Sequence, residues 1–237
     1  MLLVIKPGQK LPSLAHVQGD FDAWILQGMG SLTVETRVVR VHEGEPLPDY
    51  SLVRAVVISG SGAMVTDGSD WIESTAAWLR SAAERGLPVL GICFGHQLLA
   101  HALGGVVGDN PNGIEVGTVT VDWMPGACDD ELFQGVPDQT PLQASHRQSV
   151  LSLPPGARWL ARSLLERHHA FAWGDHVWGV QFHPEFTPAI VRQYVDYYAE
   201  RLRAEDRDPE TLRQEVQASE LGPRLLRRFA RLAGLSD

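Results

Sequence analysis

The chain has 237 residues, of which 44% are hydrophobic, and it can therefore bury one substantial core. Its formal charge of −9 is spread along the sequence without a basic cluster before the C-terminal segment, so we expect no nucleic-acid-binding surface. The chain has two cysteines, no signal-peptide pattern before Lys6 and no apolar run that approaches the roughly 20 residues needed to cross a bilayer. We therefore expect a soluble cytoplasmic protein without membrane attachment.

Short β-branched runs alternate with helix-like segments through the first half of the chain. The strand-like runs are Leu2–Ile5, Val34–Val41, Val53–Ser59 and Leu87–Cys93. Apolar residues at helical spacing predict helices at Leu14–Gly28 and Trp71–Arg85, with Asp70 as the N-cap of the second. This alternation predicts an α/β fold, in which a parallel sheet carries helices on its faces.

The pattern changes after residue 105. Val116–Trp123 is strand-like, a turn-rich stretch follows, and further strands extend to Phe182. We expect an antiparallel excursion or edge hairpins in this part. A helical period then runs over Ile190–Arg203.

The tail from residue 204 to residue 237 is charged and rich in helix formers. Asp208-Pro209 opens one segment, and Leu221-Gly222-Pro223 separates it from a helix predicted at Arg224–Leu235. The apolar residues of this last helix recur at helical spacing and are Leu225, Leu226, Phe229 and Leu232. This face must be buried, either on the chain's own domain or against a partner protein or second protomer. We predict a domain at residues 1–203 and a helical extension at residues 204–237.

A nucleophile turn is indicated at Cys93. The apolar run that begins at Leu87 ends at this cysteine, with Gly91 and Gly95 two residues away on either side. A sharp strand-to-helix reversal strains the backbone at the nucleophile and requires flanking residues without a Cβ. The positive end of the following helix would favour the thiolate.

A base and an acid for this nucleophile lie far downstream. His183 follows an apolar strand, and Glu185 comes two residues later. Alone, the cysteine is more often a buried hydrophobe, the histidine a structural residue and the glutamate a solvated carboxylate. Together, the three residues indicate a Cys-His-Glu catalytic set.

The segments Gly91-Ile92-Cys93-Phe94-Gly95-His96-Gln97 and Gln181-Phe182-His183-Pro184-Glu185 closely resemble the class I glutamine amidotransferase family of the cysteine type. The resemblance spans residues 53–198 and is nearest to the glutaminase domain of GMP synthase and its stand-alone relatives. It implies a flavodoxin-like, mostly parallel sheet with helices on both faces, in agreement with the alternation above. It also implies that Cys93 attacks the γ-amide of glutamine, forms a γ-glutamyl thioester and releases ammonia. His183 would be the base and then the acid, and Glu185 would orient His183.

The resemblance further implies contacts around the nucleophile. The oxyanion would be bound by the N–H of Phe94 and by a second N–H in the turn Ser59-Gly60-Ser61-Gly62. Family members often have Gly-Gly-Pro in this turn, so Gly60 and Ser61 both remain candidates. The implied substrate contacts are Gln97, Ser145, His146 and Glu115.

We expect neither a cofactor nor a metal. The implied thioester chemistry requires none. His96 and His101 lie five residues apart on a predicted helix, which is poor spacing for joint ligation. The neighbours His168 and His169 would point in different directions on a strand.

Three functions remain open. The first is hydrolysis of glutamine, with ammonia passed to a separate acceptor synthetase or released to solution. The second applies the same chemistry to γ-glutamyl peptides or conjugates, as stand-alone relatives of the family do. The third is a regulatory or interaction protein that uses the tail from Leu221 onward. The sequence shows no phosphate-cradling glycine loop of a synthetase half, so we do not expect GMP synthesis by this chain alone.

Overall fold

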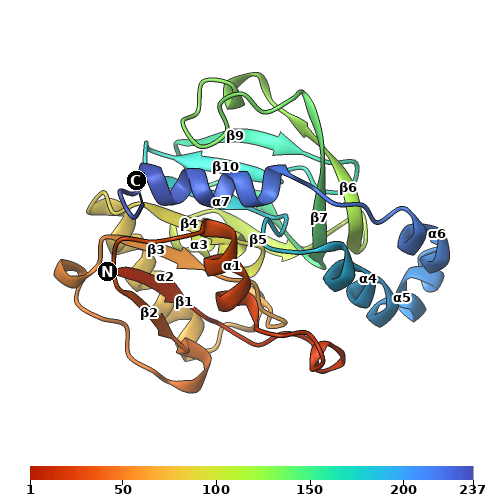
Figure 1. The fold of residues 1–237 in the computed structure, drawn as a ribbon, viewed down its shortest axis with the longest axis horizontal. Coiled ribbons are helices and arrows are strands. Elements are labelled where there is room, and N and C mark those ends of the chain that lie inside the picture. Colours follow the sequence, from red (N-terminus) through yellow and green to blue (C-terminus); the bar gives the residue numbers. More distant parts are fainter. Residues whose placement is uncertain (237) are drawn as a thin grey trace.

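A computed structural model describes residues 1–236 and contains a nine-stranded sheet in the order β2-β1-β3-β4-β11-β10-β9-β6-β7 (Figure 1). Its parallel strands are β1 (Leu2–Ile5), β2 (Thr36–Val39), β3 (Ala55–Ile58), β4 (Val89–Ile92) and β11 (Val177–Val180). The predicted α/β fold with a mostly parallel sheet is therefore confirmed. The first four strands fall inside the runs predicted from the sequence.

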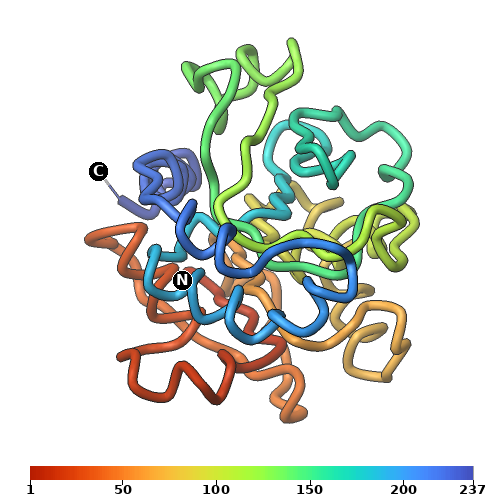
Figure 2. Tube along the Cα trace, turned by 90° about the vertical axis from the view of Figure 1, so that its right-hand side faces the viewer, coloured from red at the N-terminus to blue at the C-terminus, as the bar shows by residue number. Residues whose placement is uncertain are grey.

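The second half of the sheet is antiparallel, as expected. Its strands are β10 (Ala170–Trp173), β9 (Ala157–Arg162), β6 (Glu115–Trp123) and β7 (Gln139–His146). A separate antiparallel pair is formed by β5 (Val106–Asp109) and β8 (Gln148–Ser152). The loop between β6 and β7, drawn in green, projects from the body of the molecule (Figure 2).

Helices cover both faces of the sheet. The long helices are α1 (Phe21–Met29), α2 (Asp70–Glu84), α3 (Phe94–Ala102), α4 (Pro188–Tyr197) and α7 (Leu221–Leu232), and the short ones are α5 (Ala199–Ala204) and α6 (Pro209–Gln214). In β1, Leu2 and Val4 pack in one core with α1 and α7, whereas Leu3 and Ile5 pack in another with α2 and α3. This alternation follows from the two-residue period of a strand.

Several predicted helix ends are wrong. The helix expected at Leu14–Gly28 begins only at Phe21, because Gly19 has a positive φ of 82° and Asp20 caps the N-terminus by accepting a hydrogen bond from Phe21 N–H. The N-cap of α2 is Ser69, and Asp70 is its first helical residue. The helix expected at Ile190–Arg203 is interrupted at Tyr198 between α4 and α5.

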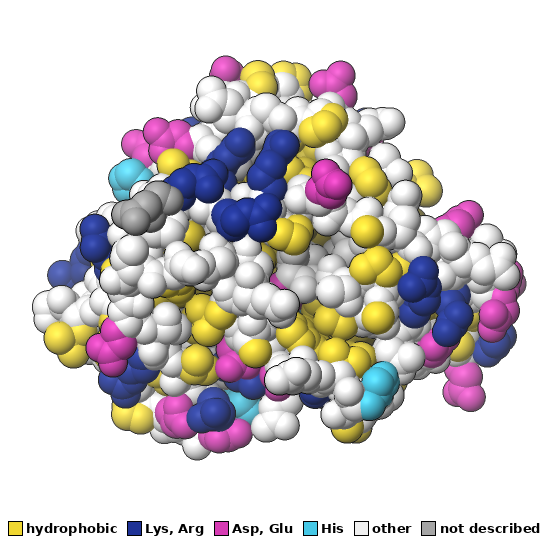
Figure 3. All heavy atoms as spheres, viewed as in Figure 1, with side chains coloured by type: hydrophobic (Ala, Val, Ile, Leu, Met, Phe, Trp, Pro, Cys, Tyr) yellow, Lys and Arg dark blue, Asp and Glu magenta, His cyan; other side chains and the backbone are white. Residues whose placement is uncertain are grey.

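The last helix starts earlier than predicted. Leu221 and Gly222 belong to α7, and Pro223 lies in its first turn, where a residue without an N–H is tolerated. Leu225, Leu226 and Phe229 are buried in the core of this chain, whereas Leu232, expected on the same face, is 39% exposed. Lys and Arg side chains gather over α7 on the outer surface (Figure 3). The division of the chain at residue 203 stays a prediction. In the part of the chain that is described, no helix is both long and apolar enough to span a membrane.

Candidate active site

The turn at Cys93 has the strain that the sequence predicts. Cys93 follows β4 and caps α3 with φ 53° and ψ −104°, a conformation that is uncommon outside glycine. A Cβ on Gly91 would lie 2.4 Å from the carbonyl oxygen of Gly95, and a Cβ on Gly95 would lie 2.4 Å from that of Ile58. Both glycines are therefore required for the backbone to close around the thiol.

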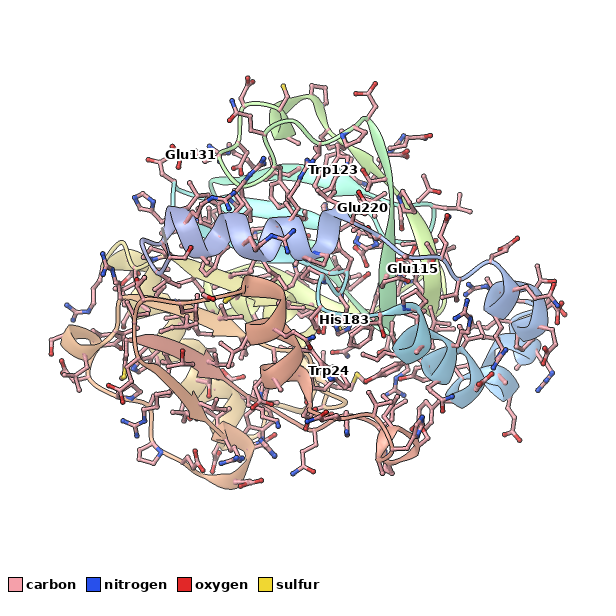
Figure 4. The ribbon with its side chains drawn as sticks, in the orientation of Figure 1. Trp24, Glu115, Trp123, Glu131, His183 and Glu220 are labelled. Carbon is pink, nitrogen blue, oxygen red and sulfur yellow. The ribbon has the colours of Figure 1, made fainter. Side chains whose placement is uncertain are left out.

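His183 and Glu185 lie beside Cys93. The carboxylate of Glu185 is 2.7 Å from Nδ1 of His183, and all three side chains are buried. The imidazole is stacked on Phe186 with ring centroids 3.8 Å apart and also contacts Phe21. These contacts fix the plane of the ring and leave Nε2 for Cys93. In Figure 4, His183 lies between α1 and α4 at the centre of the molecule.

The protonation of His183 depends on its two partners. Burial alone would lower the pKa of His183, but the charges of Glu185 and of a Cys93 thiolate, with their hydrogen bonds, raise it to about 10. At neutral pH the arrangement therefore favours the imidazolium form of His183. A proton donor therefore lies beside Cys93 before substrate arrives.

A small cavity lies against the sulfur. Its volume is about 30 Å³, which is room for one or two water molecules. Phe94 and Ser61 line this cavity, and neither backbone N–H has an acceptor among residues 1–236. Gly60 lies instead against His183, where a Cβ would come within 2.8 Å of Cε1 of the imidazole.

Three of the four predicted substrate contacts line the same cavity, namely Gln97, Ser145 and His146. The Cys93 thiol donates to the carbonyl oxygen of Ser145 over 3.6 Å. The amide nitrogen of Gln97 donates to the carbonyl oxygen of Gln148 at 2.7 Å and to the side-chain oxygen of Gln181 at 2.9 Å. Gln97 is thereby held in one orientation.

Glu115 is not among the residues that line the cavity, and it lies behind His146. Its register partner across β6 and β7 is His146, whose Nε2 is 2.9 Å from the carboxylate. His169 is also 2.9 Å from the same oxygen, and Ser163 donates to the other one. A contact of Glu115 with substrate stays a prediction, whereas its contacts with two buried histidines are observed.

This network holds opposite charges in the interior. Burial alone would raise the pKa of Glu115 and lower that of His146. The charge of His169 and the hydrogen bond with His146 nevertheless hold the pKa of Glu115 well below its usual range. The same hydrogen bond and the charge of Glu115 raise the pKa of His146 to about 9. An imidazolium at His146 therefore lies beside the cavity.

Glu115, His146 and His169 also form the one group of three such side chains, within residues 1–236, whose spacing suits a metal ion. Their donor atoms lie within 4.8 Å of one another. The histidine nitrogens share one carboxylate oxygen at 2.9 Å, the distance of a hydrogen bond. We therefore interpret the group as a hydrogen-bonded ion cluster.

A family model of class-I glutamine amidotransferases matches residues 16–195 of this chain. The chain belongs to this family. The match covers both the nucleophile turn and the His-Pro-Glu segment, so the resemblance inferred from the two motifs is confirmed.

Similar proteins include gamma-glutamyl peptidase 5 of Arabidopsis thaliana, which is 32% identical over 66% of this chain and 64% of the peptidase. The glutamine-hydrolyzing GMP synthase subunit of Archaeoglobus fulgidus is 33% identical over 75% of this chain and 93% of its own length. A glutamine amidotransferase structure from Methylobacillus flagellatus superposes with a TM-score of 0.78 at 27% identity, covering 99% of this chain and 95% of that one. The chain spans less than two thirds of the peptidase and 32% of a GMP synthase from Thermomicrobium roseum.

The sequence alone argues against His146 as a second base, because no carboxylate follows it closely. Glu115 supplies that carboxylate from the neighbouring strand, 31 residues earlier in the chain. Only the register of β6 and β7 brings the two together, and a search of local spacing could not find it. Sequence reasoning missed His169, which directly precedes β10, for the same reason.

We expect Glu115→Gln to destabilise this chain by about 3 kcal/mol at pH 7, because it removes the nearer of the two carboxylates, Glu115 and Glu166, that face the buried imidazolium of His146. The folded-state pKa of His146 is raised from 6.5 to about 9. Its stabilisation is therefore complete below about pH 6.5 and is lost as the pH rises through about 9. The melting temperature of the wild type should fall over this window, and the variant should show a flatter profile.

Thermal unfolding followed by circular dichroism from about pH 6 to pH 10 tests this expectation. The raised pKa of His183 adds a slope to both proteins, so the difference between the two curves isolates Glu115. The exposed residue Glu131 offers a matched control as Glu131→Gln. Parallel curves for wild type and Glu115→Gln would show that the pair contributes nothing to stability.

Proposed function

We propose that this chain hydrolyses the γ-amide of L-glutamine through a γ-glutamyl thioester on Cys93 and releases ammonia. The observation that carries the proposal is the contact of a strained, helix-capping cysteine with a buried histidine that is bound to a carboxylate. Membership of the class-I glutamine amidotransferase family supports the same reaction.

In the proposed first step, the Cys93 thiolate attacks the amide carbon, and the His183 imidazolium transfers its proton to the departing nitrogen. Ammonia leaves and the thioester remains. Neutral His183 then removes a proton from water, which attacks the thioester and yields glutamate and free Cys93. Glu185 orients the imidazole and stabilises its charged form throughout.

The N–H groups of Phe94 and Ser61 are the proposed oxyanion donors, since both line the cavity and both lack an acceptor within residues 1–236. We propose that Gly60 is not an oxyanion donor. Its missing side chain leaves room for the ring of His183.

A second candidate is cleavage of γ-glutamyl peptides, favoured by the similarity to gamma-glutamyl peptidase 5. The acyl half of the substrate, and hence the thioester, would be the same. The two candidates differ in the leaving group, and an amine larger than ammonia needs an open cleft beside Cys93.

We further propose that a separate acceptor synthetase receives the ammonia, in line with the similarity to the glutamine-hydrolyzing GMP synthase subunit. The unpaired Cys93 thiol would stay reduced in a cytoplasmic compartment, where we place the protein.

Steady-state release of ammonia and glutamate from L-glutamine, measured beside γ-glutamyl dipeptides, tests the proposal. We expect kcat/KM to be at least about tenfold higher for glutamine, a discrimination of about 1.4 kcal/mol. A preference for the dipeptides would make the protein a peptidase. If the protein hydrolysed neither glutamine nor the dipeptides, with or without an acceptor synthetase, its assignment as an enzyme of γ-glutamyl substrates would be refuted.

A further inference from the structure

The cavity beside Cys93 contains polar atoms that the protein itself does not satisfy. Within residues 1–236, the buried side-chain atoms without a hydrogen-bond partner include Ser145 Oγ, Arg147 Nε and Gln148 Oε1, and all three residues line this cavity. Leaving a buried donor unpaired is costly, and such groups gather where a ligand completes them. Arg147 is the one among them that carries a charge.

Apart from Cys93, the charged groups that line the cavity are cations. Its lining includes Arg147 and the charged His146 but no aspartate or glutamate among the described residues. The carboxylate of Glu115 faces Nε2 of His146 and that of Glu166 lies 3.9 Å from its Nδ1, and neither glutamate lines the cavity. An anionic group of a ligand would therefore find Arg147 free to pair with it.

The position of Arg147 is fixed relative to the nucleophile. It is the single residue between β7 and β8, and its carbonyl oxygen accepts a hydrogen bond from Asn110 N–H at 2.8 Å. Two residues earlier, the carbonyl oxygen of Ser145 lies 3.6 Å from the Cys93 sulfur. Arg147 lies in the bend between the two strands and lines the same cavity as Ser145 and Cys93.

We propose that Arg147 binds the α-carboxylate of the γ-glutamyl substrate, with Nε and an Nη forming a two-point contact. This inference rests on the proposed function. In extended glutamine the carboxyl carbon lies about 5 Å from the amide carbon, which is within reach of a group on the wall of the same cavity. The cavity of about 30 Å³ is smaller than glutamine, so side chains of its lining must move for substrate to enter, and Arg147 is half-buried.

The contact would define a substrate class. Free glutamine and γ-glutamyl peptides both carry an α-carboxylate, so Arg147 accepts both. A glutamine residue within a protein chain has its α-carboxyl group in a peptide bond and is rejected. The enzyme would therefore act on small γ-glutamyl compounds and not as a protein deamidase.

The test compares L-glutamine with L-glutamine α-amide, which lacks the negative charge. We expect Arg147→Met to lower kcat/KM for glutamine about 30-fold or more and to leave kcat/KM for the α-amide within about twofold. Arg147→Lys should recover part of the loss, since it restores the charge but not the two-point geometry. The exposed Arg203 provides the control variant Arg203→Met.

Equal losses on both substrates, or no loss on glutamine, would overturn the assignment of Arg147. A wild-type protein inactive on both substrates would instead refute the proposed function. In that case the anion preference can still be measured by alkylating Cys93 with iodoacetate and with iodoacetamide. Mass spectrometry must follow the Cys93 peptide, because Cys128 is exposed.

We expect the ratio of the iodoacetate rate to the iodoacetamide rate to fall at least about fivefold in Arg147→Met, about 1 kcal/mol of lost attraction. An unchanged ratio would show that Arg147 does not attract an anion to the nucleophile. This outcome would overturn the proposal independently of turnover.

Discussion

Replacing Cys93 with alanine is expected to lower kcat for glutamine hydrolysis by at least about 10⁴-fold, with the folded structure retained. The thioester route requires a nucleophile at this position, and His183 without it has no partner to activate. Alanine is smaller than cysteine and meets the same strained backbone, so we expect a change in stability of less than about 1 kcal/mol. Ammonia and glutamate measured at saturating substrate give kcat directly.

Cys128→Ala is the matched control, since that cysteine is exposed and far from the triad in sequence. His183→Gln separates the two halves of the reaction. Because the first step and the deacylation both use His183, this variant should form the thioester slowly and release it more slowly still. Residual activity above about 1% in purified Cys93→Ala would exclude the thioester route.

The nucleophile turn could be predicted because its demands are local. The backbone reversal at Cys93 requires glycine at positions 91 and 95, and this requirement appears in the sequence as a fixed spacing. The acid is equally local to the base, since His183 and Glu185 are two residues apart and their side chains are 2.7 Å apart. Parallel strand order brings β11 beside β4, and this places the His-Pro-Glu segment next to Cys93.

The surroundings of the cavity could not be predicted in the same way. The pairing of Glu115 with His146 depends on the register of two strands, and His169 joins them from a third part of the chain. Arg147 carries no signal in the sequence because a single arginine is most often a solvated surface residue. Its importance comes from an unpartnered Nε in a cavity without carboxylates among the described residues, which is a property of the fold.

Helix ends failed for a further reason. The apolar residues before Phe21 have helical spacing, but the positive φ at Gly19 and the capping carboxylate of Asp20 stop the helix there. Local capping therefore overrode periodicity. The start of α7 was misplaced in the opposite direction. Gly222 and Pro223 predict a break before the helix, but both residues belong to it, because the first turn of a helix tolerates proline.

Gly95→Ala is expected to destabilise the fold by about 3 kcal/mol and to lower kcat about 100-fold in the fraction that remains folded. The new Cβ would lie 2.4 Å from the carbonyl oxygen of Ile58 and 2.8 Å from its Cβ. A backbone carbonyl in the central strand β3 cannot move aside as a flexible side chain can. The start of α3 must shift instead, and with it Cys93 and the proposed oxyanion donor Phe94.

Chemical denaturation and kcat, measured on the same preparation, test both effects. Gly126→Ala is the matched control, because its Cβ would meet no atom within 4 Å and its φ is not positive. We expect this control to stay within about 0.5 kcal/mol of the wild type. If Gly95→Ala kept wild-type stability and kcat, the close packing of α3 on β3 would not be what positions Cys93. The turn would then depend on the missing Cβ of Gly91 alone.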